Sequence, residues 1–149
     1  MTDVAIRAAA PDDLPACAEI INAYIDATDW LPRLLPPDAV TALFSPRLLE
    51  SRMVFVADRD GAILGYASFD PVVRFLEALY LRPGARGQGI GKALLDAVKI
   101  AAQDGFALTV WQPSPDARWF YQREGFKVGG EGMDEDGLPV WHLQWGRAA

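Results

Sequence analysis

The sequence predicts an α/β protein of the α+β type, with a mixed, mostly antiparallel central sheet of about seven strands and four helices. Two observations lead to this prediction. Apolar runs with strand spacing alternate with segments whose apolar residues recur at helical spacing. These elements follow the order strand, two helices, three strands, helix, strand, helix and two strands, which is typical of helices packed on a largely antiparallel sheet. The 149 residues suit one domain, so we expect residues 1–149 to form a single domain.

The expected elements are bounded by turn and cap residues. Strands are expected over 4–8, 53–57, 62–69, 72–81, 107–111, 126–133 and 138–145. Helices are expected from Pro11, over 38–50, from Gly91 to a stop at Gly105, and from Ser114 to a stop at Gly125. Asp58-Arg59-Asp60-Gly61 and Asp134-Glu135-Asp136-Gly137 each predict a hairpin turn.

Two conspicuous residues of the first half are expected to be structural. Cys17 shares the apolar stripe of the first helix, which places its thiol in the core and not in a nucleophilic site. Trp30 stands in a proline-broken loop, where it could line an acceptor pocket but is expected simply to cover the core.

His142 is the only histidine, and no Cys, Asp or Glu stands at metal-ligand spacing around it, so no metal site is expected.

Composition excludes several classes of function. A net charge of −6 argues against general nucleic-acid binding. No apolar run is long enough for a membrane span, and one cysteine allows no internal disulfide, so a cytoplasmic protein is expected. Residues 82–127 hold seven Lys and Arg against four acidic residues, whereas the rest holds seven against sixteen. This division favours a polyanionic ligand at the basic segment and a cationic acceptor elsewhere.

The basic segment contains a glycine-rich turn between a strand and a helix. Gly87, Gly89 and Gly91 lack Cβ atoms and let an anion approach N–H groups at a helix N-terminus. Arg86 and Lys92 add two cations, so this turn is predicted to bind phosphate. A P-loop is excluded because Arg86 and Ala93 replace its glycine and its hydroxyl residue. The dinucleotide-binding fingerprint is excluded too, because its third glycine would fall at Lys92 when counted from Gly87 and at Leu94 when counted from Gly89.

The segment Arg86-Gly87-Gln88-Gly89-Ile90-Gly91 resembles the Arg/Gln-x-x-Gly-x-Gly/Ala pyrophosphate loop of the GCN5-related N-acetyltransferase (GNAT) family. Two further features fit the same family pattern: a Leu-Tyr-Leu strand end before the loop, and a Phe-Tyr-x-x-x-Gly-Phe segment over 120–126. The resemblance covers residues 53–126 and implies the family's acyl-coenzyme-A fold, with acetyl-CoA as co-substrate and no metal.

The resemblance also implies roles for individual residues. The strand before the loop and the strand after its helix would part, with pantetheine between them. The residues implied to bind the coenzyme are Leu79, Tyr80, Leu81, Arg86, Gly87, Gln88, Gly89, Gly91, Lys92 and Ser114. Many family members carry asparagine where this chain has Ser114, so the role of this serine could be confined to capping a helix.

Acyl transfer to an amine requires a base for the ammonium proton and an acid for the leaving thiolate. Glu77 is the only carboxylate between Pro71 and Asp96, which makes it the candidate base. The alternatives are a structural ion pair with Arg74 and an exposed acid at a sheet edge. Tyr121 matches the family tyrosine near the coenzyme sulfur, which makes it the candidate acid. Its phenol stays protonated at neutral pH.

The expected function is an N-acetyltransferase in which a primary amine attacks acetyl-CoA directly in a ternary complex. The alternative is a non-catalytic acyl-CoA-binding sensor or partner-binding domain, which would need neither Glu77 nor Tyr121. The acceptor is expected to be a small molecule or a peptide amine, and family members are often homodimers. No nucleic-acid or membrane partner is expected.

Overall fold

The computed structural model describes residues 3–147, whose seven strands form one sheet in the order β1-β2-β3-β4-β5-β7-β6. The strands are β1 Ala5–Ala8, β2 Met53–Arg59, β3 Ala62–Asp70, β4 Phe75–Leu81, β5 Gly105–Trp111, β6 Lys127–Met133 and β7 Pro139–Gly146. Every neighbouring pair is antiparallel except β4 and β5. The predicted mixed, mostly antiparallel sheet is therefore confirmed.

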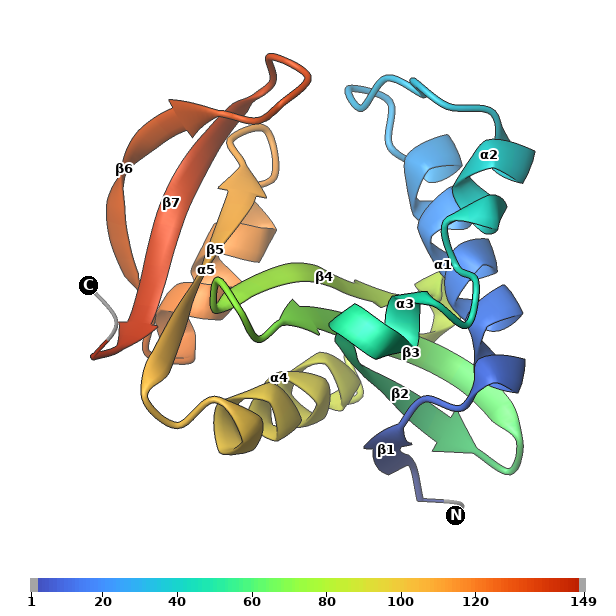
Figure 1. Ribbon diagram of the computed structural model, residues 1–149. Coiled ribbons are helices and arrows are strands. Elements are labelled where there is room, and N and C mark those ends of the chain that lie inside the picture. Colours follow the sequence, from blue (N-terminus) through green and yellow to red (C-terminus); the bar gives the residue numbers. More distant parts are fainter. Residues whose placement is uncertain (1–2, 148–149) are drawn as a thin grey trace.

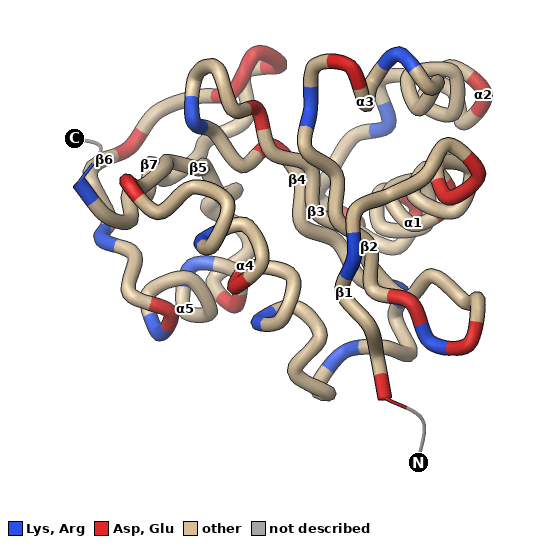
Figure 2. The backbone as a smooth tube through the Cα atoms, turned by 60° about the horizontal axis from the view of Figure 1, so that its bottom comes forward, with Lys and Arg blue, Asp and Glu red and all other residues tan. Residues whose placement is uncertain are grey.

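The helices cover both faces of this sheet, with α1 on one face and α4 and α5 on the other (Figures 1 and 2). They are α1 Leu14–Ala27, α2 Pro37–Ala42, α3 Leu48–Ser51, α4 Ile90–Ala101 and α5 Pro115–Arg123, with 3-10 turns at Pro11–Asp13 and Pro83–Ala85. The prediction of one helix over 38–50 is wrong. Pro46 has no N–H for the helical ladder, and the chain breaks there into α2 and α3.

Two apolar clusters fill the space between sheet and helices. On one face, buried residues of α4 pack with Tyr121 of α5 and with Phe106 of β5, which is fully buried. On the other face, Cys17 and Ile20 of α1 pack against Tyr66 of β3. Within residues 3–147, no helix has the length and apolar character that crossing a membrane requires.

The strand expected from residue 72 begins later, at Phe75. The side chain of Asp70 accepts hydrogen bonds from the N–H groups of Val72 and Val73 at 3.0 and 3.4 Å, which closes a turn. Arg74 completes the turn with a φ of 56°. Val72 and Val73 are exposed at this turn and contribute nothing to the sheet.

β4 pairs irregularly with both of its neighbours, β3 and β5. A bulge leaves Glu77 as the extra residue, since Ser68 pairs with Ala78 and Phe69 with Leu76. Toward β5, only one pair of residues is in register, Phe75 with Ala107. Beyond that pair the two parallel strands part, and Figure 1 shows β5, β7 and β6 turned away from β2–β4.

Cys17 provides a direct test of this core. Its side chain is fully buried, and burial together with the nearby Asp13 raises the pKa of the thiol to about 12. We expect the folded protein to resist a thiol-specific reagent at about pH 8 and to react fully once denatured. Rapid labelling of the folded protein would contradict the packing of α1 on the sheet. Because the fold raises the pKa of this thiol, the protonated form of Cys17 favours the folded state. This stabilisation is complete below the ordinary thiol pKa and is lost as pH rises through about 12.

Candidate active site

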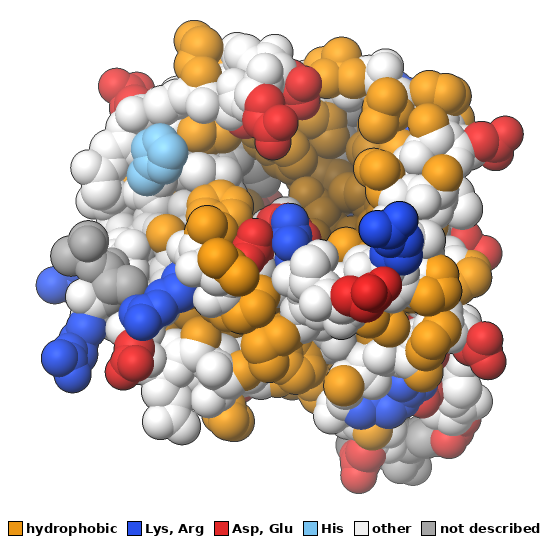
Figure 3. Space-filling view, viewed as in Figure 1, with side chains coloured by type: hydrophobic (Ala, Val, Ile, Leu, Met, Phe, Trp, Pro, Cys, Tyr) orange, Lys and Arg blue, Asp and Glu red, His pale blue; other side chains and the backbone are white. Residues whose placement is uncertain are grey.

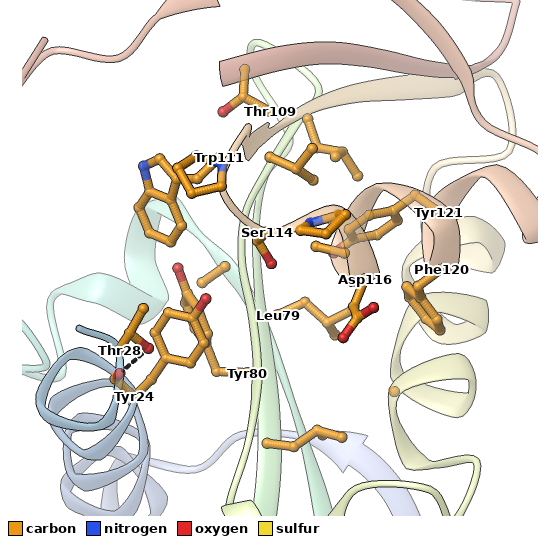
Figure 4. Close-up of a pocket in the computed structure, with 18 of the residues that line it drawn as sticks. Tyr24, Thr28, Leu79, Tyr80, Thr109, Trp111, Ser114, Asp116, Phe120 and Tyr121 are labelled. Atoms are coloured by element: carbon orange, nitrogen blue, oxygen red, sulfur yellow. Dashed lines mark hydrogen bonds between the residues drawn. The ribbon is translucent and has the colours of Figure 1, made fainter. Parts of the chain in front are cut away.

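A cavity of about 790 Å³ occupies the gap between the parted strands. It is lined by the facing segments of β4 and β5, by the C-terminal end of α1 on one side, and by the start of α5 on the other. Figure 4 shows Tyr24 and Tyr80 on one side of β4, with Phe120 and Tyr121 on the other. The cavity therefore connects the two faces of the sheet.

The edge of β4 offers unpaired backbone groups to this cavity. The N–H of Arg82 donates to the carbonyl of Leu64 on β3 at 2.8 Å, which sets the phase of the ladder. Hydrogen-bonded pairs alternate along antiparallel strands, so Tyr80 also bonds to β3. The N–H and C=O groups of Leu79 and Leu81 consequently point the other way, toward the parted β5.

β5 offers the matching groups from the opposite edge. The N–H of Ala107 donates to the carbonyl of Arg74 at 3.0 Å, so this residue turns its backbone toward β4. Every second residue of a strand faces the same way, which puts the backbone groups of Thr109 and Trp111 on the same side. No residue of β4 pairs with these two, so an extended amide-bearing chain could hydrogen-bond to both strand edges.

The glycine-rich turn follows β4 and opens α4. Gly87 and Gly89 have φ values of 77° and 79°, in the left-handed region where a side chain is strained. Gly89 is the N-cap of α4. Within residues 3–147, no group accepts a hydrogen bond from the backbone N–H of residues 86–92. The predicted phosphate-binding turn thus presents a row of free donors at a helix N-terminus.

The side chains of this turn divide into one free cation and two engaged groups. Arg86 lines the cavity, and no residue in the described range 3–147 forms an ion pair with it. Gln88 instead braces the turn, because its amide donates to the carbonyl of Gly84 at 3.1 Å. Lys92 is occupied by two carboxylates, Asp96 at 3.0 Å and Glu124 at 3.4 Å.

The three residues at the end of β4 alternate across the sheet. Leu79 and Leu81 pack with the α4–α5 cluster, whereas Tyr80 packs on the α1 side beside Tyr24 at 4.9 Å between ring centroids. Gly91 lies next to Leu81 and Phe120, because an added Cβ would meet both side chains at ordinary contact distance. All of these residues line the cavity.

Glu77 lines the cavity from the bulge in β4. Its Oε1 atom accepts hydrogen bonds from Arg52 Nε at 2.7 Å and from Ser68 Oγ at 2.9 Å. The expected alternative partner, Arg74, is not the one observed. In the described part of the chain, Oε2 accepts no hydrogen bond, so one oxygen of this carboxylate is available to another donor.

Tyr121 and Ser114 approach the cavity from the α5 side. Tyr121 is 8% exposed, and its burial raises the pKa of the phenol above the ordinary value. Ser114 is the N-cap residue of α5, but its side chain makes no capping hydrogen bond. The capping role that sequence allowed for Ser114 is therefore absent, and its hydroxyl lines the cavity.

Sequence reasoning missed the aromatic wall on the α1 side. Trp30 does not simply cover the core, as expected, but lines the cavity with Trp111 and Tyr24. The Trp30 and Trp111 rings meet edge to face at 5.7 Å, and Tyr24 stacks on Trp111 at 6.2 Å. Figure 3 looks into this hollow, whose walls are hydrophobic and whose rim carries both acidic and basic side chains. Within residues 3–147, no group of three or more His, Cys, Asp or Glu could hold a metal ion.

Comparison with known proteins agrees with this geometry. Residues 50–128 match the profile of the Acetyltransferase (GNAT) domain. The chain is 32% identical over 144 residues to the peptidyl-lysine N-acetyltransferase YiaC of Escherichia coli, covering 94% of this chain and 95% of that one. It is 31% identical over 110 residues to the L-amino acid N-acyltransferase MnaT of the same organism, covering 68% and 64% of the two chains.

A solved structure shares the fold over nearly the whole chain. The acetyltransferase from Salmonella typhimurium, determined with its cofactor acetyl-CoA, superposes with a TM-score of 0.77 at 24% identity and covers 99% of this chain and 96% of that one. The profile match spans more than half of the chain and the similarity to YiaC nearly all of it. The chain belongs to the GNAT family and is an acetyl-CoA-dependent N-acetyltransferase.

Proposed function

We propose that the protein transfers the acetyl group of acetyl-CoA to a primary amine by direct attack in a ternary complex. The observation that carries the proposal is the continuity between the free N–H groups of residues 86–92 and the gap between β4 and β5. The diphosphate binds the turn and Arg86, and pantetheine extends along the strand edges past Ser114. The backbone N–H of Leu79 then donates to the thioester carbonyl, a contact typically worth about 3 kcal/mol in the transition state.

Glu77 and Tyr121 carry the proton transfers in this proposal. The free Oε2 of Glu77 accepts the proton of the acceptor ammonium, directly or through water, while Arg52 and Ser68 hold Oε1. Tyr121 donates to the leaving thiolate from the other side of β4. Its raised pKa keeps the proton on the phenol throughout the neutral range.

The names of the relatives bear on the acceptor. YiaC is a peptidyl-lysine N-acetyltransferase and MnaT an L-amino acid N-acyltransferase. We take a primary amine as the acceptor class and acetyl as the transferred group. The amine suits the acids that line the cavity, Asp29, Glu77 and Asp116.

Arg86 tests the diphosphate site. Arg86→Ala removes a charge-assisted hydrogen bond and is expected to weaken binding of coenzyme A by about 10- to 100-fold. Binding of S-acetylpantetheine, which has no diphosphate, should not change. Isothermal titration calorimetry measures both affinities, with Arg123→Ala as the matched control because Arg123 lies outside the cavity. Equal loss for both ligands would contradict a diphosphate contact.

Glu77 tests the base. Glu77→Gln keeps the shape of the side chain and is expected to lower kcat about 100-fold near neutral pH. The deficit should shrink as pH rises, because more of the acceptor amine is already neutral. Glu50→Gln on α3, outside the cavity, serves as the control. If Glu77→Gln lowered the melting temperature and left kcat intact, the carboxylate would serve only the ion pair with Arg52.

Tyr121 tests the acid. Tyr121→Phe is expected to lower kcat about 100-fold while the affinity for coenzyme A stays the same. Since burial raises the pKa of this phenol, wild-type kcat should show no loss from its ionisation between about pH 7 and pH 9. Release of free thiol with time measures kcat. A variant that retains full kcat would remove Tyr121 from the mechanism.

A further inference from the structure

The α1 side of the cavity has an aromatic wall, and Glu77 lines the same cavity. The wall consists of Tyr24 and Trp30, which come from α1 and the turn after it, and of Trp111 at the end of β5. Trp111 is held in place because its indole N–H donates to Asp134 Oδ2 at 2.9 Å. Flat apolar walls of this kind bind methylene groups and attract cations through their ring faces.

Acids outnumber cations among the residues that line this cavity. Asp29, Glu77 and Asp116 line the cavity, and the exposed acids of the β6–β7 turn follow Asp134, whose carboxylate holds Trp111. Figure 3 shows acidic side chains on the rim of the hollow, with Lys or Arg side chains beside some of them. The excess of acids in the lining therefore favours an ammonium group over an anion at this site.

Among residues 3–147, the cations near the aromatic wall are either already paired or lie at the glycine-rich turn. Within residues 3–147, Arg86 is the only Lys or Arg that lines the cavity, and it lies at the glycine-rich turn beyond β4. Arg52 contacts Glu77, but Asp70 at 3.4 Å and Glu77 at 2.7 Å already neutralise it. A free amino acid carries a carboxylate next to its α-amine. Binding it here would place that carboxylate near Asp29, Glu77 and Asp116, and the like charges would repel one another.

We propose that the acceptor is a primary ammonium at the end of an unbranched alkyl chain with no carboxylate beside the amine, and that Trp30 and Trp111 select it. This assignment rests on the proposed acetyl transfer and adds the class of acceptor. The methylene groups lie against the aromatic wall, and the nitrogen reaches Glu77. Glu77 takes one proton from the ammonium, after which the neutral nitrogen forms a bond to the acetyl carbon and the carbon–sulfur bond breaks. The departing thiolate takes a proton from Tyr121. The second nitrogen proton, lost as the amide forms, returns through water to the phenolate of Tyr121, and Glu77 releases its proton to solvent.

A panel of amines tests the class of acceptor. Thiol release from acetyl-CoA is measured with a lysine-containing peptide blocked at both ends, with cadaverine, and with free glycine and leucine. We expect kcat/KM for the peptide or cadaverine to exceed that for the amino acids by at least about 10-fold, because the carboxylate is repelled. Comparison of the first two acceptors separates a protein lysine from a free diamine. Equal or faster acetylation of glycine and leucine would overturn the assignment and leave the proposed acetyl transfer intact.

Trp30 tests the aromatic wall. Trp30→Ala is expected to raise KM for the preferred amine about 10-fold, with little change in kcat or in the affinity for coenzyme A. Trp119→Ala is the matched control, since Trp119 is 54% exposed on α5 and lies outside the cavity. An unchanged KM in Trp30→Ala would contradict the role of this wall. Absence of thiol release with every amine would overturn the proposed function and the acceptor class together.

Discussion

The parting of β4 from β5 is the constraint on which the site depends. A parallel pair normally continues its ladder, but here one residue pair is in register before the strands separate. The bulge at Glu77 bends β4 at the point where the separation begins. The parting leaves the backbone groups of Leu79 and Thr109 without partners across the gap, and Glu77, the extra residue of the bulge, lines the cavity. Two irregularities of one strand therefore supply the cleft and its candidate base.

The glycine-rich turn depends on the same strand. β4 ends at Leu81, and Leu81 packs beside Gly91 in the first turn of α4, with Phe120 of α5 on the other side. The left-handed conformations of Gly87 and Gly89 turn the chain from β4 into α4. In this turn the backbone N–H groups donate to no carbonyl of the described residues. The free donors thus begin where the gap between the strands ends, so that one extended ligand could use both.

Local features of the sequence predicted the sheet and the turn well, because strand alternation and glycine conformations act over a few residues. Lys92 was expected to bind phosphate, but it pairs with Asp96, four residues on in the same helix. Glu124, which also contacts Lys92, approaches from α5 and leaves no such local signal. The aromatic wall was missed for the same reason: Trp30 and Trp111 are distant in sequence, and only the fold brings their rings together.

The wall is coupled to the β6–β7 turn through Asp134. Burial alone would raise the pKa of this carboxyl, but hydrogen bonds from the Trp111 indole and from the N–H groups of Leu138 and Asp136 lower it overall. A lowered pKa means that these bonds stabilise the fold above the ordinary aspartate range and lose that effect only as pH falls through the lowered value. The carboxylate is therefore charged at neutral pH, where it fixes the indole. The acidic turn that favours a cationic acceptor also holds the ring against which that acceptor would lie.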